Sequence, residues 1–342
     1  MRNRLQNGQI VTLADVARRA GVSASTASRA LNGRGELSER TRAAVADAAR
    51  ALQFQPSQLA RSLRTSTTHT VGFVVPDVAS PFYATALKGA QAKLHESGYR
   101  VLLMDCEQSA DREVEALGTL LAHRVDGLLV STVGLSRQKF ESVVGGRVPC
   151  VFFDSSIAGT GEGSVILDNR AGIELLVDHL VEHGHRRIGL LAGSLAETSG
   201  SERRAGFEAA MARHAPAVSV GGVAGQRWNV EEGIRATHEL LSRTPPPTAL
   251  VASSVELALG ALRACREAGL AVPDDLALAT FDDAYFAELL DPPLTAVAYN
   301  PGEVGRAAAA LLVEAIGDDE PRRRDVSVPV RLVLRGSCGC GR

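Results

Sequence analysis

Residues 11–34 read VTLADVARRAGVSASTASRALNGR and contain two short runs of helical apolar spacing separated by Gly21. Thr12, followed three residues later by Asp15, is typical of a capping box at the start of a helix. Gly21 stands where a left-handed residue commonly ends a helix, and Ser23 is a natural N-cap for the second run. Two helices joined by so tight a turn predict a helix-turn-helix.

A third helix is predicted in residues 37–54, LSERTRAAVADAARALQF, with Ser38 as its N-cap. Small side chains allow three helices to approach closely, so this helix can close a compact core with the first two. The residues expected to face that core from the third helix are Ala44, Val45, Ala48 and Leu52.

The charge of this segment differs from that of the remaining chain. Residues 1–65 hold 11 Arg, no Lys and 4 acidic residues, a net charge of +7, whereas the rest carries −9 of the total of −2. Arginines that neutralise phosphates release counterions, so a compact basic module favours a polyanion. We therefore interpret the three-helix module as DNA-binding.

In a helix-turn-helix the second helix enters the major groove. On its outward face, Arg29 can bind a guanine edge, Ala24 can contact a thymine methyl and Ser25 can donate or accept. The alternative for Arg29 is an ordinary solvated arginine. Short polar side chains suited to phosphate oxygens complete the predicted interface: Thr12, Ser23, Thr26, Ser28 and Asn32.

Residues 54–65, FQPSQLARSLRT, predict a further short helix that begins at Pro56. It is too short to be stable alone in water and is expected to fold against a partner. Its apolar face lies beside arginines, and such a wedge suits a DNA minor groove, where it can part a base step. The predicted minor-groove residues are Ala60, Leu63 and Arg64.

The stretch from Thr12 to Leu63 resembles the DNA-binding headpiece and hinge of the LacI/GalR family of bacterial transcription regulators, and the resemblance extends over nearly the whole chain. It implies that Ala24, Ser25 and Arg29 occupy base-reading positions and that Leu63 is an intercalating hinge leucine. It also implies a repressor that acts as a homodimer on a near-palindromic, double-stranded operator. A small-molecule effector, a sugar or sugar derivative, would control its affinity for that operator.

Beyond residue 68, buried-type strands alternate with amphipathic helical runs, which predicts parallel sheets built from βαβ units. There are too many strands for one small sheet, so two doubly wound halves with a cleft between them are expected. The predicted strands are residues 70–75, 98–104, 126–131, 149–154, 186–193, 248–253 and 276–280. The fold class is therefore an all-α headpiece followed by an α/β effector domain of two parallel-sheet subdomains, similar to periplasmic sugar-binding proteins.

The predicted domain limits are residues 1–55 for the headpiece, 56–68 for the hinge helix and linker, and 69–342 for effector binding and dimerisation. Within the last, the first subdomain is expected to comprise about 69–165 and 293–325. The second subdomain is expected to comprise about 166–292 and 326–342.

Ligands of such sheets bind beyond the carboxyl ends of the strands, where this chain places carboxylates, an arginine and aromatic rings. The predicted effector contacts are Ser80, Phe82, Tyr83, Asp154, Arg203, Trp228, Ser254, Asp282 and Tyr299. Taken singly, an aspartate at a strand end often caps the next helix, and a tryptophan is often core. Ser254 and Tyr299 also depart from the family pattern, which commonly has an Asn-Asp pair and a glutamine, so a purine-responsive regulator remains an alternative.

Metal and catalytic chemistry receive little support from the sequence. Cys338 and Cys340 are two possible thiolate ligands with no third or fourth ligand near them in sequence. His179 and His183 have helical i, i+4 spacing, but the glutamate of a zinc-protease helix is absent because Leu180 follows His179. We therefore interpret the two cysteines as part of a tail, with a metal site as the less favoured alternative, and expect no cofactor and no catalytic residue.

The rival classes are a sugar-metabolising enzyme, which would have no use for a headpiece, and a secreted sugar-binding protein. The N-terminus has no apolar leader segment and the chain has no apolar run long enough to span a bilayer. Five cysteines without a disulfide framework fit a reducing compartment. The expected location is the cytoplasm, with no membrane partner.

Overall fold

The computed structural model describes residues 11–33, 35–54, 67–318 and 320–340. The chain divides into two compact units, Met1–Thr68 and His69–Arg342. Within the described ranges, no helix combines the length and the apolar character needed to cross a membrane.

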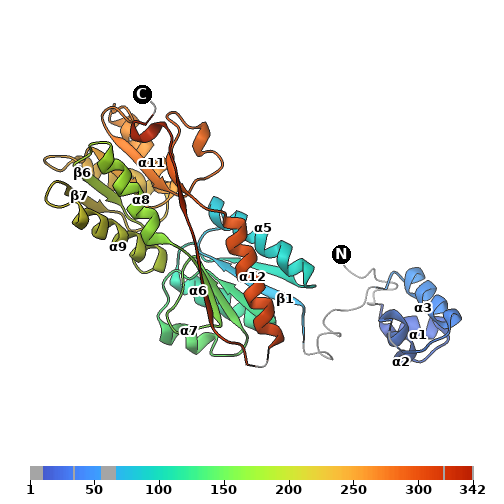
Figure 1. The fold of residues 1–342 in the computed structure, drawn as a ribbon. Helices are drawn as coiled ribbons and strands as arrows, with labels where there is room; N and C mark the ends of the chain where they lie inside the picture. The colour runs from blue at the N-terminus through green and yellow to red at the C-terminus, as the bar shows by residue number, and fades with distance from the viewer. Residues whose placement is uncertain (1–10, 34, 55–66, 319, 341–342) are drawn as a thin grey trace. The chain divides into compact units, whose positions relative to one another are not determined.

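The first unit contains helices α1 (Leu13–Ala20), α2 (Ala24–Leu31) and α3 (Glu39–Ala51) (Figure 1). The backbone N–H of Thr12 donates to the Asp15 carboxylate at 2.9 Å, and Gly21, with φ of 66°, ends α1. The Ser23 hydroxyl accepts from the N–H of Thr26 at 3.1 Å and caps α2. The predicted helix-turn-helix and third helix are confirmed.

The core of this unit is built from small side chains. Val16, Ala17, Ala27, Val45 and Ala48 are buried together with Ala49. The prediction that Ala44 faces the core is wrong, because Ala44 is exposed. Val45 sets the inward face of α3, and the 3.6-residue period then selects positions 48, 49 and 52 rather than 44.

The first subdomain of the second unit is a six-stranded parallel sheet in the order β11-β5-β4-β3-β1-β2. Helices α5 and α12 pack together on one face, and α6 covers the other. Figure 1 shows α5 and α12 side by side. The elements are β1 (Thr70–Val75), α5 (Pro81–Glu96), β2 (Arg100–Asp105), α6 (Ala110–Ala122), β3 (Gly127–Val130), α7 (Arg137–Val143), β4 (Cys150–Phe153), β5 (Gly163–Leu167), α12 (Pro301–Gly317) and β11 (Arg324–Val328).

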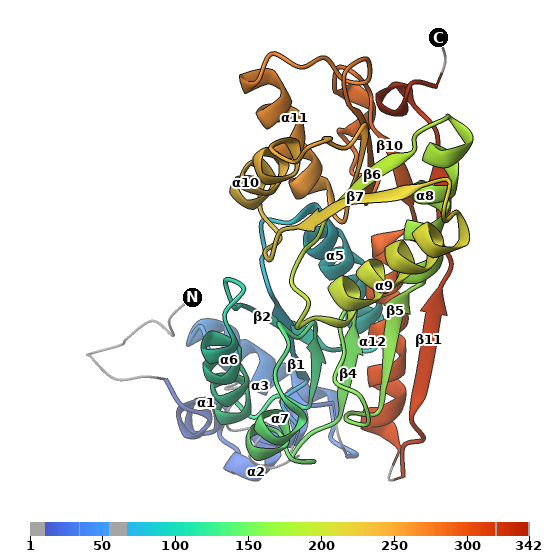
Figure 2. The same cartoon turned by 90° about the vertical axis from the view of Figure 1, so that its left-hand side faces the viewer.

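The second subdomain is a six-stranded sheet in the order β12-β10-β9-β8-β6-β7, in which only the β12–β10 pair is antiparallel. Helices α10 and α11 pack against each other, as do α8 and α9. Figure 2 shows strands of both sheets in a view turned by 90° from that of Figure 1. The elements are α8 (Asn169–Glu182), β6 (Arg187–Leu191), α9 (Thr198–Arg213), β7 (Ser219–Ala224), α10 (Val230–Leu241), β8 (Ala249–Ala252), α11 (Val255–Glu267), β9 (Ala277–Phe281), η1 (Ala287–Leu289), β10 (Thr295–Ala298), β12 (Arg331–Val333) and η2 (Gly336–Cys338).

The chain passes between the two sheets three times, after β5, after β10 and after β11. Two predicted subdomain limits need correction. Residues 293–298 were assigned to the first subdomain, but β10 pairs with β9 and β12 of the second. Residues 326–328 were assigned to the second, but they continue β11 beside β5. The backbone N–H and C=O groups of a buried strand must be paired, so a whole strand belongs to one sheet. The chain therefore crosses between the sheets only after a strand has ended.

Candidate functional site

A cavity lies between the two subdomains, at the carboxyl ends of their parallel strands. All nine residues predicted to contact an effector line it: Ser80, Phe82, Tyr83, Asp154, Arg203, Trp228, Ser254, Asp282 and Tyr299. Six further residues complete the lining, namely Pro76, Asp77, Gln108, Glu197, Ser199 and Glu256.

Two aspartates occupy matching places in the two subdomains. Asp154 directly follows β4, and Asp282 directly follows β9. Both have left-handed backbone conformations, with φ of 61° and 76°. Non-glycine residues adopt this region rarely and at a cost in energy, and such positions cluster at ligand sites. Because the backbone turns at these two residues, both aspartates line the cavity.

Among the described residues, Arg203, on α9, is the only cation that lines the cavity, and it is 4% exposed. Its Nε donates to Asn169 Oδ1 at 2.8 Å, and its Nη1 donates to the Ser253 carbonyl at 2.5 Å. The guanidinium carbon lies 3.8 Å from the centre of the Phe281 ring, and Nη1 is 3.9 Å from Asp282 Oδ2. These two hydrogen bonds use two of five N–H donors, so the fixed guanidinium keeps donors for a ligand.

Tyrosines hold the two aspartates. The Tyr83 hydroxyl donates to Asp154 Oδ2 at 2.9 Å and lies 3.2 Å from the Ser131 hydroxyl. The Tyr299 hydroxyl donates to Asp282 Oδ1. Each carboxylate therefore has a defined orientation and retains acceptor capacity toward the cavity.

Trp228 is fixed by contacts from both subdomains. Its indole N–H donates to Glu197 Oε1 at 3.0 Å, and its backbone exchanges hydrogen bonds with the Gln108 side chain at 3.3 and 3.4 Å. A Cβ on Gly193 would lie 2.2 Å from the indole, so the ring needs a glycine at the end of β6. The ring is half-buried and lines the cavity.

The cavity is rich in carboxyl groups. Burial, helped by the nearby Asp154, raises the pKa of Glu197 to about 8. Burial also raises the pKa of Asp154 to about 6, although Arg203 opposes the shift, and it raises the pKa of Glu256. The carboxyl groups that line the described cavity together with the Arg203 guanidinium are Asp77, Asp154, Glu197, Glu256 and Asp282. This balance disfavours an anionic ligand.

Two polar contacts join the subdomains directly across the cavity. The Ser80 hydroxyl, at the start of α5, donates to Glu256 Oε1 at 3.0 Å in the first turn of α11. The Gln108 side chain, which follows β2, makes the second contact with the Trp228 backbone. A ligand in the cavity can therefore strengthen or replace contacts that set the arrangement of the subdomains.

The sequence analysis missed Asp77, Gln108, Glu197 and Glu256, which offer the strongest additional polar groups. A usable signal existed, because each follows a parallel strand of its own subdomain: β1, β2, β6 and β8. Treating every loop after a parallel strand as a cavity wall would have included Asp77 and Gln108, whereas Glu197 is the N-cap residue of α9 and Glu256 lies in the first turn of α11.

The first unit presents the predicted base-reading residues to solvent. Ala24, Ser25 and Arg29 are exposed on α2, and within residues 11–33 and 35–54 Arg29 has no hydrogen-bond or ion-pair partner. The Ser25 hydroxyl lies 2.8 Å from the Ser23 hydroxyl.

Several of the residues predicted to bind phosphate also serve the fold. Thr12 and Ser23 cap helices, Thr26 bonds Ser23, and the Asn32 amide donates to the Ser28 carbonyl at 2.7 Å. Ala60, Leu63 and Arg64 lie outside the described residues.

The sequence places no further ligand near Cys338 and Cys340, but the fold brings histidines beside them. His179 of α8 lies beside both sulfur atoms, and His183 lies beside Cys340. The two histidines are more than 150 positions from the two cysteines in sequence, and packing of η2 against β9 and β10 brings the two pairs together. Sequence spacing carried no sign of that contact.

Comparisons with known proteins cover both units. Residues 12–57 match a family model described as bacterial regulatory proteins, lacI family, and residues 177–338 match a periplasmic binding protein-like domain. The HTH-type transcriptional repressor PurR of Actinobacillus pleuropneumoniae serotype 3 (strain JL03) is 31% identical, over 96% of this chain and 98% of that protein.

The ribose operon repressor of Escherichia coli (strain K12) is 33% identical, over 96% of this chain and all of that protein, 100%. Among solved structures, a lac repressor dimer bound to operator and the anti-inducer ONPF is similar, with a TM-score of 0.84 and 29% identity. That match covers 96% of this chain and 99% of that one.

Proposed function

Since this chain belongs to the lacI family of bacterial regulatory proteins and is a DNA-binding transcriptional repressor with an effector domain, we propose that a neutral sugar in the cavity controls its binding to a near-palindromic operator. It is a regulator and not an enzyme. Its place of action is the cytoplasm, where the operator is accessible.

The headpiece proposal rests on α2. Its exposed Ala24, Ser25 and Arg29 are set on one outward face, and a free guanidinium there can bind a guanine edge bidentately. Thr12, Ser23, Thr26, Ser28 and Asn32 place short polar groups beside it, suited to phosphates that set the register. Ala60, Leu63 and Arg64 are proposed to enter the minor groove at the operator centre.

A homodimer is proposed because a near-palindrome has two half-sites, and the lac repressor in the similar structure is a dimer on its operator. The edge strand β2 supports this proposal, since it exposes Leu102 and Leu103, each 39% exposed, beside an unpaired strand edge. Exposed apolar edges of this kind favour pairing with another chain.

The ligand proposal rests on one observation: five carboxyl groups and one guanidinium share a cavity with aromatic rings. Carboxylates accept strong hydrogen bonds from neighbouring hydroxyls, and a ring covers an apolar sugar face. The acidic lining opposes phosphate esters. A purine is the second candidate, because Phe82, Tyr83 and Trp228 also offer stacking surfaces.

Control of DNA binding is proposed to act through the subdomain arrangement. Ser80–Glu256 and Gln108–Trp228 join the two halves across the cavity. A ligand that binds one arrangement more tightly shifts the population toward it and changes the spacing of the segments that lead to the headpieces.

The test combines two measurements on the full-length protein. Selection of bound duplexes from a random pool should return a near-palindromic site. A thermal-shift screen should then find stabilisation by a neutral sugar, and not by its phosphate ester, because a ligand specific to the folded state raises the melting temperature. That sugar must also change affinity for the selected DNA. Stabilisation by a purine alone would replace the sugar proposal with the second candidate.

A further inference from the structure

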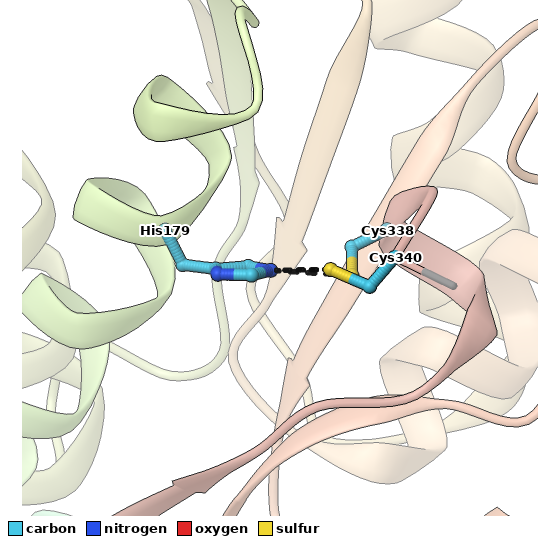
Figure 3. Close-up of side chains that lie close together, drawn as sticks. All are labelled: His179, Cys338 and Cys340. Carbon is cyan, nitrogen blue, oxygen red and sulfur yellow. Dashed lines mark hydrogen bonds between the residues drawn. The ribbon is translucent and has the colours of Figure 1, made fainter. Parts of the chain in front are cut away.

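A second cluster of reactive side chains lies in the second subdomain and shares no residue with the cavity lining. His179 lies in the last turn of α8, and His183, four residues later, is the C-cap of the helix. Cys338 ends η2, and Cys340 follows after Gly339, whose φ of 89° lets the chain turn between the two cysteines. Figure 3 shows the His179 ring directed from α8 at the sulfur atoms of Cys338 and Cys340.

The ligand atoms of His179, Cys338 and Cys340 lie close to one another, and His183 adds a contact to Cys340. His179 Nε2 lies 3.2 Å from Cys338 Sγ and 3.2 Å from Cys340 Sγ. The two sulfur atoms are 3.0 Å apart, and His183 Nε2 is 3.1 Å from Cys340 Sγ. In the described part of the chain, no other three His, Cys, Asp or Glu residues gather their ligand atoms in this way.

We propose that His179, His183, Cys338 and Cys340 form a structural Zn²⁺ site. Two thiolates and two imidazoles are a donor set that selects tetrahedral zinc. Ideal metal–ligand bonds of about 2.0 to 2.3 Å place neighbouring donor atoms about 3.5 Å apart. The ligand atoms of His179, Cys338 and Cys340 all lie within 4.8 Å of one another, so outward shifts of less than about 1 Å admit the ion. The His183 imidazole, which lies beside Cys340 Sγ, must turn toward the ion to supply the fourth ligand.

The surroundings hold the ligands in position. Cys338 is 1% exposed and His179 is 5% exposed, so bulk water has little access to these two side chains. The Nδ1 of His183 lies 2.9 Å from the His179 carbonyl. When that nitrogen donates to the carbonyl, Nε2 keeps its lone pair toward Cys340, which is the usual arrangement of a metal-bound histidine.

The turn that carries the cysteines is anchored to the sheet. The Ser337 hydroxyl donates to the Leu278 carbonyl at 2.6 Å and accepts from the Thr295 N–H at 2.9 Å. The Arg335 guanidinium binds the Asp283 carboxylate through two nitrogens, at 2.7 and 3.0 Å. Zinc at this site would bind the end of the described chain to α8 and stabilise the second subdomain, since metal binding free energy adds to folding free energy.

The experiment uses untagged, full-length protein, reduced and stripped with a chelator. Titration with Co²⁺ should produce the visible bands of a tetrahedral site and a sulfur-to-cobalt charge-transfer band, saturating at about one ion per chain. Zn²⁺ should displace the cobalt and raise the melting temperature. Cys340→Ser, at a half-buried position, should keep the native circular dichroism spectrum and lower Zn²⁺ affinity by more than about tenfold. Cys338→Ser should do the same or more.

Two matched controls should leave metal binding unchanged. Cys265→Ser removes a buried thiol on α11 that is remote from the cluster in sequence and belongs to another core region. His123→Ala removes a histidine whose Nδ1 lies 2.8 Å from its own helix carbonyl, as in His183, but without a cysteine beside it. His183→Ala should weaken zinc binding, whereas His123→Ala should not.

Three outcomes would overturn the proposal. The first is the absence of a cobalt–thiolate band in reduced protein, and the second is equal metal content in the parent and in Cys340→Ser. The third is a protein that binds no metal when reduced and loses two hydrogens on oxidation, with the link mapped to Cys338–Cys340. In that case the cysteines form a thiol–disulfide pair and not a metal site.

Discussion

The eight headpiece residues predicted to touch DNA lie between positions 12 and 32, whereas the nine predicted cavity residues are spread from position 80 to position 299. In the first unit, two short helices with their caps place every candidate on or beside one helix face. In the second, loops after several strands of two sheets must meet. A surface within one supersecondary motif depends on local rules, and a cavity between subdomains depends on the whole packed domain.

The largest effect is expected for a substitution in the cavity of the second unit. Arg203→Ala removes the guanidinium that faces Asp154 and Asp282 and is 4% exposed. Removing one partner of a buried charged network costs about 3 to 5 kcal/mol. We expect loss of effector binding and a lower urea midpoint for the second unit, measured by calorimetry and by denaturation.

Arg204→Ala is the matched control for that change. Arg204 is the next residue on α9, and its pair with Glu208 is exposed. Exposed pairs contribute about 0 to 1 kcal/mol. If Arg204→Ala weakens effector binding as much as Arg203→Ala does, the cavity assignment of Arg203 is wrong.

A pH profile tests the buried acids of the cavity. Glu197 has a folded-state pKa of about 8, above its unfolded value of 4.5. Between these two pH values the folded state therefore holds a proton that the unfolded state releases. The contribution of protonated Glu197 to the free energy of unfolding is fully present below pH 4.5 and is lost as pH rises through about 8. Glu197→Gln should raise stability at pH 8.5 relative to the parent, by about 4 to 5 kcal/mol, and should flatten the profile.

The readout is the variant-minus-parent difference in unfolding free energy between pH 5 and 9. This difference matters because the pKa of the buried Glu113 is also raised, to about 7, and affects both proteins equally. The exposed Glu208→Gln serves as the control and should leave the slope unchanged. A Glu197→Gln profile parallel to that of the parent would mean that Glu197 is ionised in the folded protein.

A substitution in the first unit is expected to have a smaller effect, limited to DNA binding. Arg29→Ala should weaken binding to the selected operator by about 1 to 3 kcal/mol and relax the preference at one base pair in each half-site. Binding to random duplexes and to the effector should stay close to the parent, as measured by fluorescence anisotropy and calorimetry. Arg50→Ala, on the exposed face of α3, is the control. Equal losses on operator and random DNA would make Arg29 a phosphate contact.

The smallest effect comes from the only tryptophan of the chain. Effector binding should shift or quench Trp228 emission and saturate with the same dissociation constant as calorimetry gives. Trp228→Phe keeps a ring but loses the bond to Glu197, so affinity should fall by about 1 kcal/mol while DNA binding of the unliganded protein persists. An effector that leaves the emission unchanged would place Trp228 outside the ligand contact.

Much of the cavity was accessible to sequence reasoning because strand ends in parallel sheets share an edge. That rule selected Asp154 and Asp282 directly from the residues that follow two apolar strands. It did not select Glu197 or Glu256, because each stands inside the N-terminal region of the following helix, where a carboxylate is expected for capping alone. Their burial depends on the opposite subdomain, which no local pattern describes.

The sequence by itself determined the helix-turn-helix, the alternation of strands and helices and the opposite charges of the two units, because caps, apolar periods and charge counts act over a few residues. Tertiary structure alone decided which strands share a sheet at the crossings near residues 298 and 328, and which acids face Arg203. It also decided that Cys338 and Cys340 meet His179. At a separation of more than 150 residues, the local conformation of the chain does not specify which side chains meet. Such contacts are decided only by how buried strands and helices pack together.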